Sequence, residues 1–311
     1  MTFFSPDEQL EQLGKIILES TWGEFPGLTR SQIALTWIVY HPPVIVNTGG
    51  AISPTEFWKH RVGGFSYRGS ERIYPASVVK LFYLVAIYEW LEGGMIPSSP
   101  ELERAILDMI VDSSNDATSL VVDVLTGTTS GPELPPGPFA TWKYQRNIVN
   151  RYYQSLGWEE LESINVNQKT WGDGPYGRER VFLGELMDNR NMLTTDAVAR
   201  LLHSIIGGVA VSSGRSQQMM NLLQRSLNPP KQDGVENQVT GFLGGGLPNN
   251  AQLWSKAGWT SQVRHDAAYI EIPNKPPFLL VVFTEGKTHS NNPELIPFIS
   301  RAVVNALDNL G

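Results

Sequence analysis

The chain contains no cysteine. Disulfide bonds, thiolate catalysis, zinc–thiolate sites and iron–sulfur clusters are therefore excluded. Long apolar runs are also lacking, since the longest, Leu81–Tyr88, is far shorter than the roughly 20 residues of a membrane-spanning helix. The first residues, MTFFSPDEQLEQLGK, show no basic stretch followed by an apolar core, so no secretory signal peptide is visible. We expect no membrane span, and the sequence leaves the localisation unknown.

Basic residues are in the minority. The chain has 24 Lys and Arg against 31 Asp and Glu, a net charge of −7, and no block of basic residues. This balance argues against nucleic acid and anionic membrane surfaces as the main partners. Of the 311 residues, 41% are hydrophobic and 18% are charged, which is typical of a globular protein with a core. The length allows two or three domains, or one large domain with two lobes.

The order of helix and strand patterns predicts an α+β fold. The chain opens with a helical period at Gln9–Ser20 and strand-like segments at Ile33–Tyr40 and near Gly64–Arg72. Helical patterns then follow at Ser77–Leu91, Glu101–Val111, Ala117–Leu125, Thr141–Leu156, Thr195–Ile206 and Ser213–Leu227. Strand-like segments return at Gln252–Lys256, Val263–Ile272 and Phe278–Glu285, before a last helix at Glu294–Leu307. We expect an antiparallel sheet built from both termini and flanked by helices, with an inserted all-helical lobe.

The predicted sheet lobe comprises residues 1–73 and 208–311, and the predicted helical lobe comprises residues 74–207. Two glycine-rich segments are interpreted as loops. Thr128–Pro138, rich in Gly and Pro, predicts an exposed loop. Gly241–Gly246 could instead be a phosphate site, but no Gly-Lys-Ser/Thr follows it, so a flexible loop is favoured.

The segment Tyr74-Pro-Ala-Ser77-Val-Val-Lys80 is the most informative part of the sequence. If a helix begins at Ser77, the spacing places Ser77 and Lys80 on one helix face. The first turn favours developing negative charge, and a partly desolvated lysine can accept the serine proton. This is a nucleophile and a base within one turn. The alternative is that Ser77 is an N-cap and Lys80 a solvated surface charge.

Two further segments are weak signals when each is taken alone. In Asp112-Ser113-Ser114-Asn115-Asp116, between two predicted helices, Ser113 and Asn115 can point into a cleft. The alternative is ordinary capping of the next helix. Lys256 opens Lys256-Ala-Gly258 on a predicted strand, where it is either a binding group or a surface lysine before a turn.

The three motifs occur in one order, Ser-x-x-Lys, Ser-x-Asn and Lys-x-Gly. This triplet resembles the signature of serine β-lactamases and penicillin-binding proteins, and the chain is most similar to the class A β-lactamase type. The segment that begins Asn191-Met-Leu-Thr194-Thr195 resembles the one that follows the active-site Ω-loop in class A enzymes. The resemblance runs from about residue 30 to the C-terminus. Only 36 residues separate Ser77 from Ser113, which implies a shortened connection.

The resemblance implies a role for each matched residue. Ser77 matches the acylated nucleophile, and Lys80 matches its activating base or proton relay. Ser113 matches the serine that passes a proton to the leaving nitrogen, and Asn115 matches the asparagine that holds the amide side chain of the substrate. The oxyanion hole would consist of the backbone N–H groups of Ser77 and Trp259.

Residues around the third motif are implied to bind the substrate. Lys256 would supply positive potential near the substrate carboxylate, and Gly258 would let the ligand approach the backbone closely. The family usually has Thr or Ser where this chain has Ala257, and Thr260 would compensate for the missing hydroxyl. Arg264, on the next predicted strand, resembles the carboxylate-binding arginine of many members.

His265 and Asp266 allow a different interpretation, a Ser–His–Asp arrangement with Ser77. Adjacent residues on a strand point to opposite faces, which disfavours this interpretation. The alternative for His265 is a structural hydrogen bond.

A glutamate decides the fate of the acyl-enzyme in class A enzymes, where Glu-x-x-x-Asn on the Ω-loop holds the hydrolytic water. Glu185-Leu-Met-Asp-Asn189 has this spacing and precedes Thr194. The gap to Thr194 is shorter than in the family, and the usual arginine before the glutamate is absent. Glu185 is the catalytic candidate and Glu179 a second one. The alternative for Glu185 is an exposed loop carboxylate without function.

The sequence thus predicts a serine hydrolase that forms an acyl-enzyme and hydrolyses β-lactams, with its active site in the cleft between the two lobes. One alternative is a D-Ala-D-Ala peptidase or small-ester hydrolase on the same site. Another is a non-catalytic protein that binds peptidoglycan fragments or β-lactams. We expect no cofactor and no metal, a small-molecule or peptidoglycan-derived substrate, no nucleic acid and a monomer. The family implies a periplasmic or secreted protein.

Overall fold

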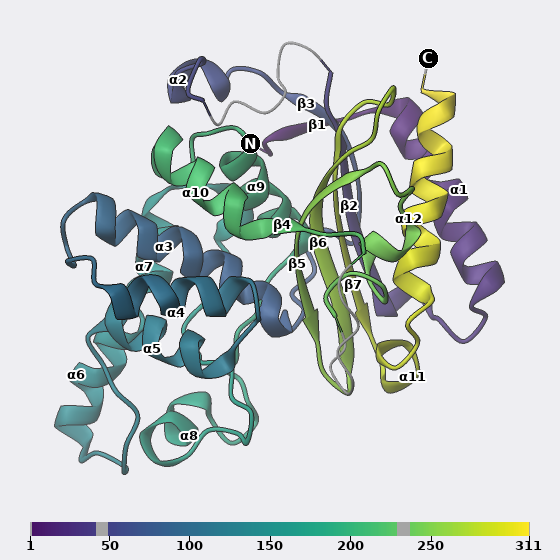
Figure 1. Cartoon of the computed structure of the whole chain (residues 1–311). Coiled ribbons are helices and arrows are strands. Elements are labelled where there is room, and N and C mark those ends of the chain that lie inside the picture. Colours follow the sequence, from purple (N-terminus) through teal and green to yellow (C-terminus); the bar gives the residue numbers. More distant parts are fainter. Residues whose placement is uncertain (1, 42–48, 229–236, 311) are drawn as a thin grey trace. The chain divides into compact units, whose positions relative to one another are not determined.

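The computed structural model describes residues 2–41, 49–228 and 237–310. The chain folds into two compact units, a sheet unit of Met1–Glu71 and Thr194–Gly311 and a helical unit of Arg72–Leu193 (Figure 1). The first boundary differs from the predicted one by two residues. The second lies at 193/194 rather than at 207/208, because helix α9 (Thr195–Ile206) packs on strands of the sheet.

The sheet unit contains a seven-stranded sheet. Its strands lie in the order β1-β3-β2-β7-β6-β5-β4. All neighbouring pairs are antiparallel except β1 and β3, which are parallel, so the sheet is mixed rather than wholly antiparallel. The strands are β1 (Phe4–Pro6), β2 (Ile33–Val39), β3 (Val62–Tyr67), β4 (Gln224–Arg225), β5 (Gln252–Trp259), β6 (Val263–Glu271) and β7 (Phe278–Glu285).

Helices cover both faces of this sheet. Helices α1 (Glu8–Glu24) and α12 (Leu295–Ala306) contact each other on one face, and α9 lies on the other with α10 (Ser213–Leu223) beside it (Figure 1). Every residue of β2 is buried, as expected for a strand covered on both sides. Two short helices, α2 (Pro54–Phe57) and α11 (Lys287–Ser290), complete the unit.

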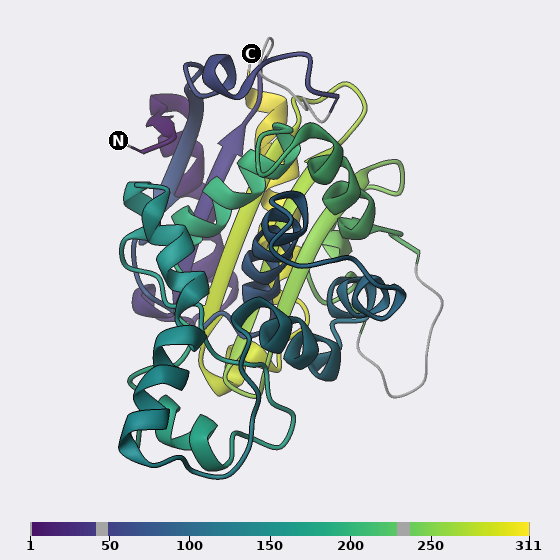
Figure 2. The same cartoon turned by 90° about the vertical axis from the view of Figure 1, so that its left-hand side faces the viewer.

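The helical unit is organised around α3 (Lys80–Glu92). This helix is apolar on nearly all sides and contacts α4 (Pro100–Ile110), α5 (Asn115–Thr126) and α7 (Ile148–Ser155). Figure 2 draws the helices of this unit in blue to teal. Helices α6 (Pro136–Arg146) and α8 (Gly177–Leu183) complete the unit. A backbone bridge between Ile73 and Leu193 joins the two ends of the unit.

The predicted α+β class is confirmed, and the differences are local. The helix predicted over Thr141–Leu156 is two helices, because α6 ends at Arg146 and α7 begins after Asn147. Gly241–Gly246 is not a simple loop, since a 3-10 helix spans Leu243–Gly246 and packs against α12. Strands β1 and β4 and helix α8 were not predicted, since three, two and seven residues are too short to show a clear period.

Candidate active site

Ser77 lies in the 3-10 turn Ala76–Val79, which leads directly into α3. Its side chain is half-buried and its carbonyl oxygen accepts the backbone N–H of Lys80. The turn has no side-chain cap, so Ser77 is not an N-cap. Ala76 has a φ of 45°, a left-handed conformation that is costly for alanine and that tends to occur at functional sites. The strain therefore lies directly before the predicted nucleophile.

Lys80 is fully buried, with 0% exposure, so the interpretation of a solvated surface charge is wrong. Its Nζ donates to the carbonyl oxygen of Ser113 (2.5 Å), to Ser113 Oγ (3.1 Å) and to Asn115 Oδ1 (2.9 Å). All three acceptors are uncharged. Burial lowers the pKa of the Lys80 amine to about 7, because the charged form loses its hydration. A neutral fraction of this amine is present near neutral pH and can accept a proton.

The residues of the second motif have two roles, because one caps helix α5 and two accept hydrogen bonds from Lys80. Ser114 is the N-cap of α5, and its Oγ accepts the N–H of Ala117 at 3.1 Å. Ser113 has a φ of 57°, which turns the chain so that both Ser113 and Asn115 contact Lys80. The structure thus brings together three of the predicted residues from two motifs that are 33 to 35 positions apart.

Neither candidate glutamate is hydrogen-bonded to Lys80, and no carboxylate among the described residues accepts from its amine. Glu185 is exposed on the turn after α8, as the alternative interpretation expected. Glu179 is buried in α8, and its Oε1 lies 2.5 Å from Arg146 Nη2.

Lys256 of the sheet unit is also fully buried, so it is not a surface lysine. Its Nζ donates to Gln238 Oε1 (2.7 Å) and to the carbonyl oxygen of Ala257 (2.9 Å). Asp266, on the neighbouring strand, accepts the backbone N–H groups of Leu243 and Ala267. Burial raises the pKa of the Asp266 carboxyl to about 6, while these two hydrogen bonds and the charge of Lys256 counteract the rise. Gln238 was not singled out from the sequence.

The remaining predicted residues lie around the end of β5. Trp259 is 45% exposed and Thr260 is half-buried just beyond the strand. Gly258 pairs with His265, and Trp259 pairs with Arg264. The guanidinium of Arg264 is buried, and its Nε and Nη1 donate to the carbonyl oxygens of Ser290 and Gly241.

His265 has the structural role that the alternative interpretation gave it. Its Nδ1 accepts the backbone N–H of Thr284 at 3.1 Å, and its ring stacks on Phe283 with centroids 4.2 Å apart. The imidazole is fully buried between strands of the sheet. These contacts belong to sheet packing and not to a proton relay.

Sequence reasoning missed a group of amides and a phenol beside α3. Tyr83 Oη donates to the carbonyl oxygen of Gln168 at 2.6 Å. Asn191 Oδ1 accepts the N–H groups of Asn167 and Gln168, and its Nδ2 donates to the Gln168 carbonyl. The only sequence signal was a high density of Asn and Gln in 165–168 and 189–191, which does not identify the contacts.

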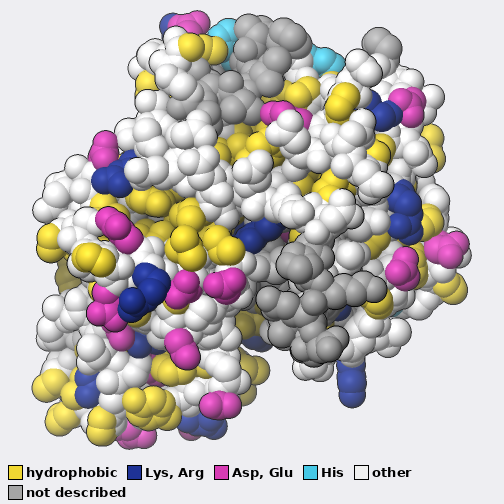
Figure 3. Space-filling model, viewed as in Figure 1, with side chains coloured by type: hydrophobic (Ala, Val, Ile, Leu, Met, Phe, Trp, Pro, Cys, Tyr) yellow, Lys and Arg dark blue, Asp and Glu magenta, His cyan; other side chains and the backbone are white. Residues whose placement is uncertain are grey.

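Three properties of the described residues concern possible partners. On the face drawn in Figure 3, acidic and basic side chains are interspersed and form no extended basic region. Within residues 2–41, 49–228 and 237–310, no helix is long and apolar enough to cross a bilayer. The same residues contain no group of three or more acidic or histidine side chains that could hold a metal ion.

Comparison with known proteins identifies the fold first. The chain is similar to a mutant of PBP-A in an acyl-enzyme complex with penicillin G, with 18% identity, 98% of each chain covered and a TM-score of 0.65. It is similar to a β-lactamase from Sphaerobacter thermophilus DSM 20745, with 19% identity, 95% of this chain and 98% of that chain covered and a TM-score of 0.60. A class A β-lactamase from Bacteroides cellulosilyticus DSM 14838 gives 15% identity, coverage of 97% and 100%, and a TM-score of 0.61. The fold is therefore that of β-lactamases and transpeptidases, as predicted.

The family follows from the sequence. The model of the beta-lactamase enzyme family matches residues 97–307, which is more than half of the chain. The chain belongs to this family, and both family and fold are those of serine β-lactamase-like hydrolases. Comparison with curated protein sequences gives no significant match.

Proposed function

We propose that this protein forms a covalent acyl-enzyme with β-lactams at Ser77 and hydrolyses that intermediate slowly. The observation that supports the proposal best is the buried Lys80 amine, held by Ser113 and Asn115 three residues after Ser77. Its pKa of about 7 suits a general base at neutral pH.

In the proposed acylation, neutral Lys80 accepts the proton of the Ser77 hydroxyl. The Ser77 oxygen then attacks the carbonyl carbon of the lactam, the ring C–N bond breaks, and an ester to Ser77 forms. Ser113, whose Oγ accepts a hydrogen bond from Lys80, gives its hydroxyl proton to the leaving nitrogen and takes the proton of Lys80 in exchange, which leaves the lysine neutral again. The backbone N–H groups of Ser77 and Trp259 are assigned to the oxyanion, where each such donor is typically worth about 10²–10³ in rate.

Substrate binding is assigned to residues of the second and third motifs. We assign the amide side chain of the substrate to Asn115 and its carboxylate to Lys256 and Thr260, with Gly258 allowing close approach of the backbone. Arg264 already donates to two carbonyl oxygens, so we assign it a supporting positive charge rather than a direct contact.

The positions of the two candidate glutamates support slow hydrolysis. In class A enzymes a glutamate activates the hydrolytic water, and among the described residues no carboxylate is hydrogen-bonded to the Lys80 amine. Glu185 is exposed, and Glu179 is committed to Arg146. The same observation favours a second candidate function, a D-Ala-D-Ala peptidase or small-ester hydrolase, because such an enzyme passes its acyl group slowly to water or to an amine.

Labelling with a fluorescent penicillin and turnover of a chromogenic cephalosporin test the proposal. We expect a label that survives denaturation, slow colour change, and neither in Ser77→Ala. Glu185→Gln serves as a matched control and should behave as the wild type. Rapid turnover would assign efficient β-lactam hydrolysis and contradict the slow step. Absence of both label and turnover would end the β-lactam proposal and leave p-nitrophenyl esters and D-Ala-D-Ala peptides as substrates to test.

A further inference from the structure

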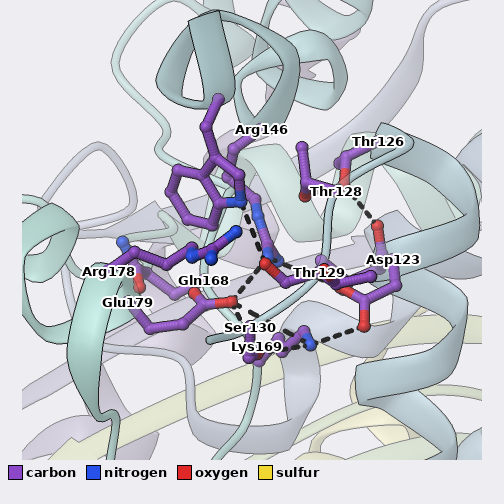
Figure 4. Close-up of polar contacts among 12 residues, drawn as sticks. Asp123, Thr126, Thr128, Thr129, Ser130, Arg146, Gln168, Lys169, Arg178 and Glu179 are labelled. Carbon is purple, nitrogen blue, oxygen red and sulfur yellow. Dashed lines mark hydrogen bonds and ion pairs between the residues drawn. The ribbon is translucent and has the colours of Figure 1, made fainter. Parts of the chain in front are cut away.

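Two cations and two carboxylates form a cluster inside the helical unit, drawn in Figure 4. Arg146 Nη2 lies 2.5 Å from Glu179 Oε1 and 3.5 Å from Asp123 Oδ1. Lys169 Nζ lies 2.7 Å from Asp123 Oδ2 and 3.9 Å from Glu179 Oε1. Ser130 bridges the cluster, since its Oγ accepts from Lys169 and donates to Glu179, both at 2.8 Å. The cluster balances two positive against two negative charges.

Because the cluster is buried, its ion pairs are expected to add little to the free energy of unfolding. The side chains of Arg146 and Glu179 are 0% exposed and that of Lys169 is 3% exposed, so their hydration is lost. The attraction within a buried ion pair often does no more than offset that loss, whereas it fixes the geometry of the groups closely. The cluster joins α5, the 128–131 segment, α6, the 167–170 stretch and α8, which are far apart in sequence. The cluster therefore fixes the positions of these segments relative to one another.

Of these segments, the 167–170 stretch is the one that is hydrogen-bonded to helix α3, which carries Lys80. Lys169 anchors this stretch in the cluster. The carbonyl oxygen of Gln168 accepts from Tyr83 Oη and Asn191 Nδ2, and the N–H of Gln168 donates to Asn191 Oδ1. Tyr83 follows Lys80 by three residues in α3, so the two side chains leave the same helix face about 4.5 Å apart along the axis. The stretch is thus tied to the face of α3 that carries the Lys80 amine.

We propose that Tyr83 and Lys169 are positioning residues that clamp the 167–170 stretch against α3 and thereby keep the surroundings of Lys80 dry enough for reaction at Ser77. This proposal rests on the assignment of Ser77 and Lys80 as nucleophile and base. It does not depend on β-lactams as substrates. The polar groups that contact the amine, Ser113 and Asn115, are uncharged, so hydration rather than a counter-charge sets the balance between its charged and neutral forms.

The test compares two phenols of the same unit. Tyr83→Phe removes the bond to the Gln168 carbonyl, whereas Tyr153→Phe removes an equally buried bond, from Tyr153 Oη to the Phe82 carbonyl at 2.6 Å. Both changes loosen an anchor of α3, but only the first releases the stretch. A second pair is Lys169→Met, which removes the cation, and Lys169→Arg, which keeps it.

The rate of Ser77 acylation is measured against pH with the fluorescent penicillin and, in parallel, with a fluorophosphonate, which labels activated serines of any specificity. We expect Tyr83→Phe and Lys169→Met to raise the pH midpoint by about one unit, which lowers the rate at pH 7 about fivefold. Tyr153→Phe should keep the wild-type midpoint, and Lys169→Arg should restore it. Hydrogen exchange of the amides of residues 167 and 168 should quicken only in Tyr83→Phe and Lys169→Met.

An unchanged midpoint in folded Tyr83→Phe, or an equal shift in Tyr153→Phe, overturns the clamp. Loss of penicillin labelling together with normal fluorophosphonate labelling in the wild type refutes only the β-lactam proposal. If neither reagent labels Ser77, the assignment of the nucleophile fails and the clamp has no reaction to control. Unchanged exchange at residues 167 and 168 in both releasing variants also overturns it.

Discussion

Each unit contains one fully buried lysine at a predicted motif, and the two lysines have opposite surroundings. Within the part of the chain that the structure describes, Lys80 donates to uncharged oxygens of Ser113 and Asn115. Lys256 donates to an amide and a carbonyl oxygen and also has the carboxyl group of Asp266 within electrostatic range. Burial without a counter-charge favours the neutral amine, whereas a nearby carboxylate favours the cation. This difference in surroundings agrees with the two roles that we propose, proton transfer for Lys80 and binding of the substrate carboxylate for Lys256.

The largest expected effect comes from removing each lysine in turn. Lys80→Met should lower the acylation rate by about 10²–10⁴-fold, the usual contribution of a general base, while substrate affinity changes little. Lys256→Met should instead weaken substrate binding, because the group assigned to the carboxylate is lost. It should also lower the free energy of unfolding by about 1–3 kcal/mol, because Gln238 Oε1 and the carbonyl oxygen of Ala257 lose the buried amine that donates to them.

Stopped-flow labelling at several penicillin concentrations separates the two effects, and urea unfolding gives the stability. If the comparison is right, Lys80→Met lowers the acylation rate constant, and Lys256→Met lowers the affinity for penicillin. The same loss of rate constant, with unchanged affinity, in both variants would show that the two lysines do not differ in role.

The sequence motifs identified both lysines, because Ser-x-x-Lys, Ser-x-Asn and Lys-x-Gly have fixed spacing and order. Their burial did not follow from the sequence, which allowed both to be surface lysines, whereas both are fully buried in the structure. The strained Ala76 and Ser113 were equally invisible, since alanine and serine rarely adopt positive φ and no residue type signals it. Strain of this kind is set by tertiary contacts.

Long-range polar contacts account for most of what the sequence did not reveal. Thr128–Pro138 has the composition of an exposed loop, yet Ser130 belongs to the buried cluster and α6 begins at Pro136. Glu179 and Lys169 are ten residues apart without helical or strand spacing, so no periodicity links them to Arg146. Partners of this kind are chosen by packing between segments, which local patterns do not record.

The next effect concerns stability and pH in the helical unit. In the unfolded chain Lys80 has a pKa near 10.5, and in the folded protein its pKa is about 7. Between these values the unfolded state binds more protons, so stability rises with pH. We expect the free energy of unfolding of the wild type, relative to Lys80→Met, to increase by about 4 kcal/mol from pH 7 to pH 10.5.

Chemical unfolding of both proteins at a series of pH values measures this difference. Only the difference is informative, because tyrosines and other lysines titrate in the same range and cancel between the two proteins. If the difference in the free energy of unfolding between the two proteins did not change with pH, the folded Lys80 amine would be protonated like an ordinary lysine.

The smallest of the three effects lies in the sheet unit and has the opposite sign. Burial raises the pKa of Asp266 from 3.8 to about 6, so between these values the folded state binds more protons than the unfolded one. The stability that Asp266 contributes is present below pH 3.8 and is lost as the pH rises through 6. Relative to Asp266→Asn, the wild type should therefore lose about 2 kcal/mol from about pH 4 to pH 6.

Unfolding of the wild type and Asp266→Asn across this range gives the slope, and Lys256→Met links it to the lysine. Because the charge of Lys256 lowers the pKa of Asp266, its removal should move the upper end of the window above pH 6. An unmoved window in Lys256→Met would mean that Asp266 does not stabilise the Lys256 cation. The contrast between the two lysines would then depend on Lys80 alone.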